Sequence, residues 1–160
     1  MIKAIVWGGD YTDNLEDIIN EEVITLGQAI GLIRESIKNK KEKEIFYDEL
    51  AHNAIDPKES GIIAGISRDE RRHYEILRGL YYKFTGIVLP HYISFFNEYI
   101  NLSYKEQLEK ALFIETDAIK RYRRIMGAMP DNESYILLMS IMTDGIRHAD
   151  LFNFLIVSQK

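Results

Sequence analysis

The chain has 160 residues, a formal net charge of −5 and an isoelectric point near 5.4, so a nucleic acid is not expected as its main partner. Hydrophobic residues make up 46% of it, enough for one domain with a sizeable core and too many for a disordered chain. It contains no cysteine, which excludes a disulfide scaffold, a cysteine-ligated zinc or iron–sulfur site and a cysteine nucleophile.

Residues 1–20 are predicted to form an N-terminal strap. The opening "MIKAIVW" is apolar but too short for a signal peptide or a membrane span. The stretch "GGDYTD" that follows is typical of a turn. The sequence therefore predicts a cytoplasmic chain without membrane contact.

Four long helices are predicted to follow and to form one domain over residues 21–160. Asp56 is expected to cap the second helix, with Pro57 at its first position. Ser103 and Glu106 have the spacing of a capping box and mark the start of the third helix. The predicted helices cover residues 21–53, 57–85, 104–129 and 132–157.

The apolar residues of each helix recur at steps of three and four, which places them on one face. Short connections within the first and the second pair of helices predict two antiparallel hairpins. The link over residues 86–103 can reach roughly 60 Å at ~3.3 Å per residue, more than the ~42 Å length of a helix of ~28 residues. We therefore predict an all-α, four-helix bundle whose hairpins are joined by a long crossover.

Polar side chains interrupt the apolar faces at Glu70, His73, Glu115 and His148, where an unpaired charge is costly. Each of these positions lies 75 residues from a counterpart in the other pair of helices. The offset indicates an internal duplication of one helical hairpin. The related pairs are Lys40 and Glu115, Tyr47 and Tyr122, Glu70 and Gly145, and His73 and His148.

Residues 27–157 resemble the rubrerythrin-like branch of the ferritin-like superfamily, and the resemblance rests on four motifs. "SRDERRHYEIL" is similar to the E-x-x-H motif of the family's second helix, here Glu70 and His73. "ETDAIKRY" is similar to its third-helix element, a ligand Glu115 followed by Tyr122. "DGIRHADLF" resembles the fourth-helix motif, and "KKEKEIFY" resembles the first helix. The resemblance implies the ferritin-like fold.

In that family the four helices supply a Glu, an E-x-x-H, a Glu and a second E-x-x-H, which together hold two iron or manganese ions. Lys40 stands where the glutamate of the first helix is expected, and Gly145 stands where that of the fourth helix is expected. Two of the six ligands are therefore missing. The metal ligands that the resemblance implies here are Glu70, His73, Glu115 and His148.

The net charge of the site differs according to how many metal ions it holds. Glu70 and Glu115 with an ionised Lys40 carry a net charge of −1, so two divalent ions would leave +3 in a core of low dielectric. One divalent ion would leave +1. A site with two metals would need further acidic ligands, and Glu44 and Asp144 are the candidates as substitutes.

Three states of the site remain open from the sequence. In the first, the site holds no metal and the Lys40 ammonium takes a metal's place beside Glu70 and Glu115. In the second, it holds one iron, manganese or zinc ion. In the third, it holds two ions. Tyr47 and Tyr122 are either hydrogen-bonded to the site or ordinary core aromatics with a partnered hydroxyl.

The resemblance implies an oxidoreductase of rubrerythrin type that handles peroxide, oxygen or iron. Rubrerythrins also carry a cysteine-ligated iron domain, so in this cysteine-free chain an external protein would have to deliver electrons. The alternative is a metal-free, non-catalytic bundle that serves binding or assembly. The aromatic stretch "LPHYISFFNEY" in the crossover is expected to cover the bundle or to form a homodimer contact.

Overall fold

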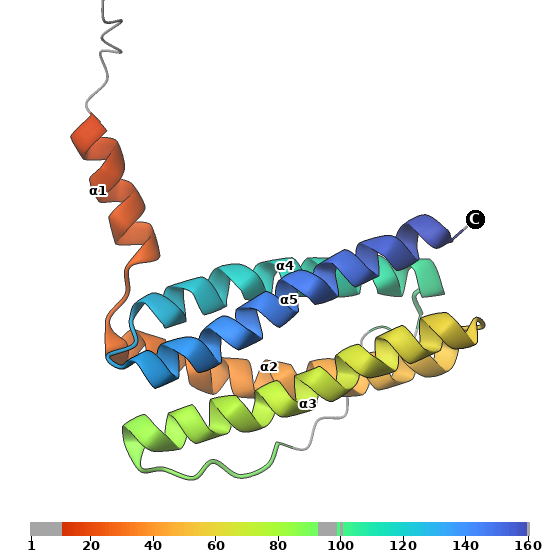
Figure 1. The fold of residues 1–160 in the computed structure, drawn as a ribbon, viewed down its shortest axis with the longest axis horizontal. Coiled ribbons are helices and arrows are strands. Elements are labelled where there is room, and N and C mark those ends of the chain that lie inside the picture. The colour runs from red at the N-terminus through yellow and green to blue at the C-terminus, as the bar shows by residue number, and fades with distance from the viewer. Residues whose placement is uncertain (1–10, 93–98, 100, 160) are drawn as a thin grey trace, which may run out of the picture.

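The computed structural model describes residues 11–92, 99 and 101–159, of which 11–14 and 21 are described by their backbone alone. Within these ranges the regular structure is entirely helical, and no helix is long and apolar enough to cross a bilayer. Helices α2 to α5 form a bundle, and α1 projects away from one end of it (Figure 1). The helices are α1 (Tyr11–Glu22), α2 (Leu26–Asn53), α3 (Pro57–Thr85), α4 (Tyr104–Gly127) and α5 (Asn132–Ser158).

The bundle consists of two hairpins. Helix α2 packs against α3, α4 packs against α5, and the hairpins meet through α2 against α4 and α3 against α5. Helix α3 finishes at one end of the bundle and α4 begins at the other (Figure 1), so the connection over 86–103 joins opposite ends, as predicted. Most of the aromatic stretch predicted as a cover or dimer contact lies outside the described residues.

The second predicted helix begins where Asp56 and Pro57 placed it, because the Asp56 carboxylate accepts from the N–H of Lys58. The third begins directly after Ser103, which forms the predicted capping box with Glu106. The predicted ends of these helices agree with the structure to within two residues.

The first predicted helix was wrong at its start. A second capping box, in which Thr25 and Gln28 exchange hydrogen bonds, makes Leu26 the first helical residue of α2 instead of residue 21. Part of the predicted strap and turn is also helical, because α1 runs from Tyr11 to Glu22. Its apolar side chains have helical spacing but stay about half exposed: Leu15, Ile18 and Ile19.

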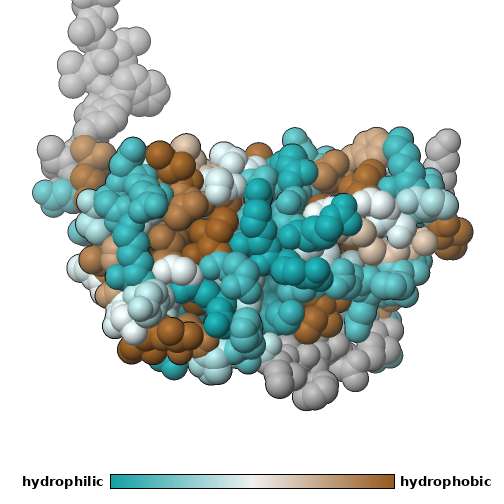
Figure 2. Space-filling model, turned by 60° about the horizontal axis from the view of Figure 1, so that its bottom comes forward, coloured by the Kyte–Doolittle hydropathy of each residue, from teal (hydrophilic) through white to brown (hydrophobic). Residues whose placement is uncertain are grey.

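The core has two apolar clusters, one at each end of the bundle, with a polar layer between them. One cluster contains Ile33, Leu77 and Leu138, and the other contains Phe46 and Phe152. The outer surface is mixed, and Figure 2 shows hydrophilic residues over the middle of one face with hydrophobic patches toward its ends.

The buried positions of the two hairpins repeat at the predicted offset of 75 residues, which places the polar layer at the same depth in each. The repeated buried pairs in α2 and α4 are Ile33 and Leu108, Ser36 and Ala111, Lys40 and Glu115, Tyr47 and Tyr122, and Leu50 and Ile125. Those in α3 and α5 include Ile63 and Leu138, Ile66 and Ile141, Glu70 and Gly145, His73 and His148, Leu77 and Phe152, and Leu80 and Leu155.

Candidate functional site

The two carboxylates and two imidazoles singled out in the sequence meet at the centre of the polar layer, and all four side chains are fully buried. His148 Nδ1 lies 3.7 Å from Glu70 Oε1 and 3.9 Å from Glu115 Oε2. His73 Nδ1 lies 3.4 Å from the same Glu70 oxygen, and the two imidazole rings are 6.0 Å apart. The duplicated helical pattern therefore brings these groups together as predicted.

The Lys40 ammonium lies inside this cluster, and the side chain is only 2% exposed. Its Nζ is 2.8 Å from Glu70 Oε1 and 3.3 Å from His73 Nδ1. It also lies 5.2 Å from the centre of the Tyr122 ring, within the range of a cation–π contact. Lys40 therefore occupies the half of the site that faces His73.

A second ammonium, that of Lys43, enters the site without having been predicted. Its Nζ is 2.9 Å from Glu115 Oε1 and 3.7 Å from Glu70 Oε2, and the side chain is 7% exposed. The sequence pointed to Lys40 and, as a substitute ligand, to Glu44, which is a step of four residues along this helix. A step of three residues places Lys43 on the same face, so the signal was present in the sequence.

The two tyrosines also belong to the site. Tyr47 donates from its hydroxyl to Glu115 Oε1 at 2.7 Å. Burial, and then the negative charge of Glu115, raise the pKa of Tyr47 well above its usual range, so the hydroxyl keeps its proton and acts as a donor. Burial likewise raises the pKa of Tyr122, which packs beside Lys40.

Each imidazole is anchored by an aspartate from the opposite hairpin. His73 Nε2 lies 2.9 Å from Asp144 Oδ2, and His148 Nε2 lies 3.1 Å from Asp69 Oδ2. Because an ionised carboxylate only accepts, the proton of each neutral ring is assigned to Nε2. The Nδ1 lone pairs of both rings therefore face the centre of the site.

Two arginines complete this arrangement at the surface. Arg72 donates to Asp144 at 2.5 Å, and Arg147 donates to Asp69 at 2.6 Å. Burial tends to raise the pKa of both aspartates, but the histidine and arginine contacts outweigh it and lower the pKa. Both groups of residues come from the pattern D-x-x-R-H, which occurs in "DERRH" and in "DGIRH". This repeated pattern could have identified Asp69, which the sequence analysis missed.

The inner ion pairs are balanced in charge. Burial alone would raise the pKa of Glu70 and of Glu115, but the lysine ammoniums reverse the effect. Lys40 and Lys43 hold the pKa of Glu70 well below its usual range, and Lys43 lowers that of Glu115 to about 2. Two ammoniums and two carboxylates therefore sum to zero.

At the centre of the site, three buried acceptor atoms have no hydrogen-bond partner among the described residues: Glu70 Oε2, Glu115 Oε2 and His148 Nδ1. One ligand atom from each of these residues lies within 4.8 Å of the others, so this cluster could hold a metal ion. His73 is not among these three residues, and its Nδ1 faces the Lys40 ammonium.

The remaining candidates do not contribute ligands to the cluster. Glu44 pairs with Lys41 and Arg71 toward the surface. Asp144 is held by His73 and Arg72 instead of facing the cluster. The structure therefore places neither predicted substitute ligand among the groups that could hold a metal.

Gly145 lies beside Glu115. A Cβ at this position would be 3.6 Å from Glu115 Oε2 and 3.5 Å from Ile119 Cγ1, which is ordinary van der Waals contact. Steric exclusion therefore does not require glycine here.

No protein-family model matches this chain, and no curated protein sequence matches it. The crystal structure of a conserved hypothetical protein from Mycobacterium tuberculosis is similar to it, with a TM-score of 0.70 and 12% sequence identity. The similarity covers 85% of this chain and 96% of that one. At this level of identity it shows a shared fold alone.

Proposed function

We propose that this chain is a ferritin-like bundle of rubrerythrin ancestry in which two lysine ammoniums have replaced a dinuclear metal centre. The protein is then a metal-free binding module and not a redox enzyme. The crossover between two hairpins and the resemblance of the four motifs support the ancestry. The pairing of Lys43 with Glu115 supports the loss of metal, because it completes a neutral network.

Charge is the physical reason for this choice. A divalent ion at the cluster would bring the two ammoniums and two carboxylates from zero to +2, and two ions would bring them to +4. Uncompensated charge in a buried site costs several kcal/mol per ion, so these residues do not fit two metal ions while both lysines are ionised.

The test is metal content measured by elemental analysis of the full chain, expressed with iron, manganese and zinc and purified without chelators. The parent chain is expected to carry less than about 0.1 ion per chain, because its carboxylates are already paired. The double variant Lys40→Ala with Lys43→Ala leaves two carboxylates unbalanced and is expected to bind one divalent ion. One ion per parent chain would overturn the proposal.

A second candidate function is favoured by the three acceptor atoms without hydrogen-bond partners. Glu70, Glu115 and His148 supply two oxygens and one nitrogen, a ligand set that suits one iron, manganese or zinc ion. Such an ion would supply redox or Lewis-acid chemistry toward peroxide or oxygen, with electrons from another protein. A stoichiometric metal in the parent chain together with peroxide turnover would favour this candidate.

A further inference from the structure

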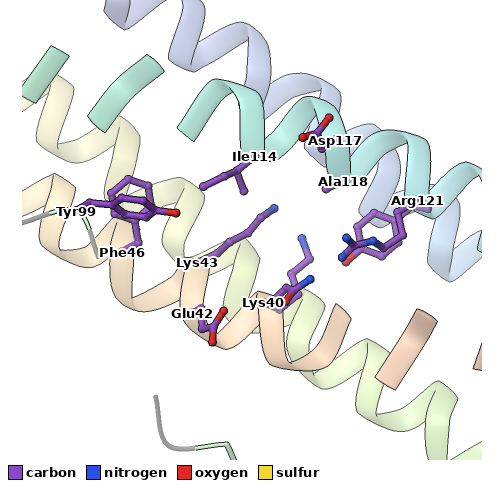
Figure 3. A pocket seen from close by; sticks show the side chains of 11 residues that line it. Lys40, Glu42, Lys43, Phe46, Tyr99, Ile114, Asp117, Ala118 and Arg121 are labelled. Carbon is purple, nitrogen blue, oxygen red and sulfur yellow. The ribbon is translucent and has the colours of Figure 1, made fainter. Parts of the chain in front are cut away.

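The ammoniums of Lys40 and Lys43 also form the inner end of a pocket between α2 and α4. The pocket has a volume of about 230 Å³. Figure 3 shows both lysine side chains extending from α2 toward α4, with Ile114 and Ala118 on the opposite helix. Its walls combine polar and charged residues with five apolar or aromatic ones: Phe46, Tyr99, Ile114, Ala118 and Tyr122.

The two ammoniums have donors that the network of the core does not use. Each ammonium carries three N–H donors. Among the described residues, Lys40 directs two of them to Glu70 and His73. Lys43 directs one to Glu115, and its other carboxylate neighbour, Glu70 Oε2, is 3.7 Å away, beyond a hydrogen bond. At least one donor on each lysine therefore makes no hydrogen bond among the described residues, and the Lys40 ammonium also faces the Tyr122 ring.

Charge decides what kind of molecule can use these donors. The inner network is neutral, so an ion of either sign bound at its edge would leave an unbalanced charge next to a buried site. Three further charged residues line the pocket: Glu42, which pairs with Lys38, Arg121, which pairs with Glu35, and Asp117, whose carboxylate disfavours an incoming anion. An uncharged hydrogen-bond acceptor leaves no unbalanced charge beside the buried site and is not repelled by the acidic residues of the lining.

We propose that this pocket binds a small uncharged molecule that carries a carbonyl group on an aromatic or cyclic body. The carbonyl oxygen accepts from Lys40 and Lys43, and the ring packs against Ile114 and the aromatic walls. The volume lies below the ~300–1,000 Å³ of sites for drug-sized ligands, so the ligand is smaller than these. This inference rests on the proposed function, since both ammoniums must remain in place.

The experiment compares four probes with one ring and different polar ends: benzamide, acetophenone, benzoate and benzylamine. Binding to the full chain, shown to be metal-free by elemental analysis, is measured by saturation-transfer NMR and calorimetry. Benzamide and acetophenone are expected to bind with dissociation constants below about 1 mM, as for compact ligands of this size. Benzoate and benzylamine are expected to bind at least about tenfold more weakly.

Two variants locate the binding. Ala118→Leu adds atoms to the pocket wall and is expected to weaken benzamide binding at least about tenfold. Ala149→Leu, at a half-buried position of α5 that does not line the pocket, is the matched control and leaves binding unchanged. If Ala118→Leu does not fold, the Ile114 methyl signals of the parent protein should shift on adding benzamide.

The possible failures are distinguishable. Stoichiometric metal in the parent chain contradicts the proposed function. A metal-free protein that binds neither neutral probe, or that prefers benzoate, contradicts the ligand assignment and leaves the metal-free network standing. Equal loss of benzamide binding in both variants would also overturn the assignment.

Discussion

Among single residues, Lys43 has the largest effect on the chemistry of the core. With Lys40 alone, the two buried glutamates would carry an excess negative charge that one cation could balance. With Lys43 paired to Glu115, no further cation is needed. Because of Lys43, the site is expected to hold two ammoniums beside Glu70 and Glu115 instead of one ammonium and a metal ion.

The contribution of the Lys43–Glu115 pair to the free energy of unfolding can be measured by comparing a single variant with a double variant. Lys43→Met leaves Glu115 buried without its ammonium and should cost about 3–5 kcal/mol in the free energy of unfolding. Lys43→Met combined with Glu115→Gln should cost less than Lys43→Met alone, because no charge is left unpaired. Urea denaturation at neutral pH measures both. The control Lys41→Met removes a partly exposed ion pair with Glu44 and should cost less than about 1 kcal/mol.

The pairing of Lys43 with Glu115 should also make the stability of the fold depend on pH in the acid range. The pKa of Glu115 is about 2 in the folded chain, against 4.5 as the ordinary value. A carboxylate with a lowered pKa stabilises the fold above its unfolded pKa and loses that contribution as pH falls toward the folded pKa. The loss amounts to about 3 kcal/mol between pH 4.5 and 2. Urea denaturation across this range should show a smaller loss for Lys43→Met, and equal slopes would contradict the assignment.

The sequence predicted the four converging groups because helical periodicity fixes which residues share a face. It did not distinguish Lys43 from Glu44, because steps of three and of four both fit a pitch of 3.6 residues. In the structure Lys43 turns inward and the Glu44 carboxylate pairs toward the surface. Asp69 was missed because the repeat of D-x-x-R-H in the two hairpins was not recognised, and because its contact with the His148 ring crosses from one hairpin to the other.

Among the elements, the helix ends were predictable wherever a cap was recognised. Asp56 and Ser103 marked their helices correctly. The start of α2 was misplaced because the capping box of Thr25 and Gln28 was not recognised. Helix α1 is short, and its tie to the bundle includes an ion pair between Glu22 and Arg123. The described side chains of α1 are largely exposed, so the helix has no buried apolar face from which the sequence could predict it.

The glycine of α5 permits a test at the scale of a helix. Gly145→Ala and Gly31→Ala should each stabilise the chain by about 0.5–1 kcal/mol, because alanine loses less backbone entropy in a helix. A Cβ at Gly31 meets no atom within 4 Å, so this variant is the matched control for helix propensity. Thermal denaturation of both measures the gain. Destabilisation by Gly145→Ala alone would show that the space beside Glu115 is needed.

At the scale of the whole molecule, the two hairpins share their burial pattern and differ in the residues at the centre. The lengths of the connections predicted the hairpins and the crossover, and the offset of 75 residues predicted which buried positions of the two hairpins correspond. The copies differ at the residues that set the charge of the site. Lys40 and Lys43 correspond to Glu115 and Ala118, and Gly145 corresponds to Glu70.

Making the two hairpins equivalent at these positions should create a dinuclear site. In the variant Lys40→Glu, Lys43→Ala and Gly145→Glu, each substitution copies the residue of the other hairpin. Four glutamates would then balance two divalent ions, with an imidazole from each hairpin, as in ferritin-like bundles. We expect two ions per chain by elemental analysis, against none in the parent. The variant that retains Lys43 is the control and should bind fewer ions, because its ammonium still pairs with Glu115. Equal metal content in the two variants would contradict the role given to Lys43.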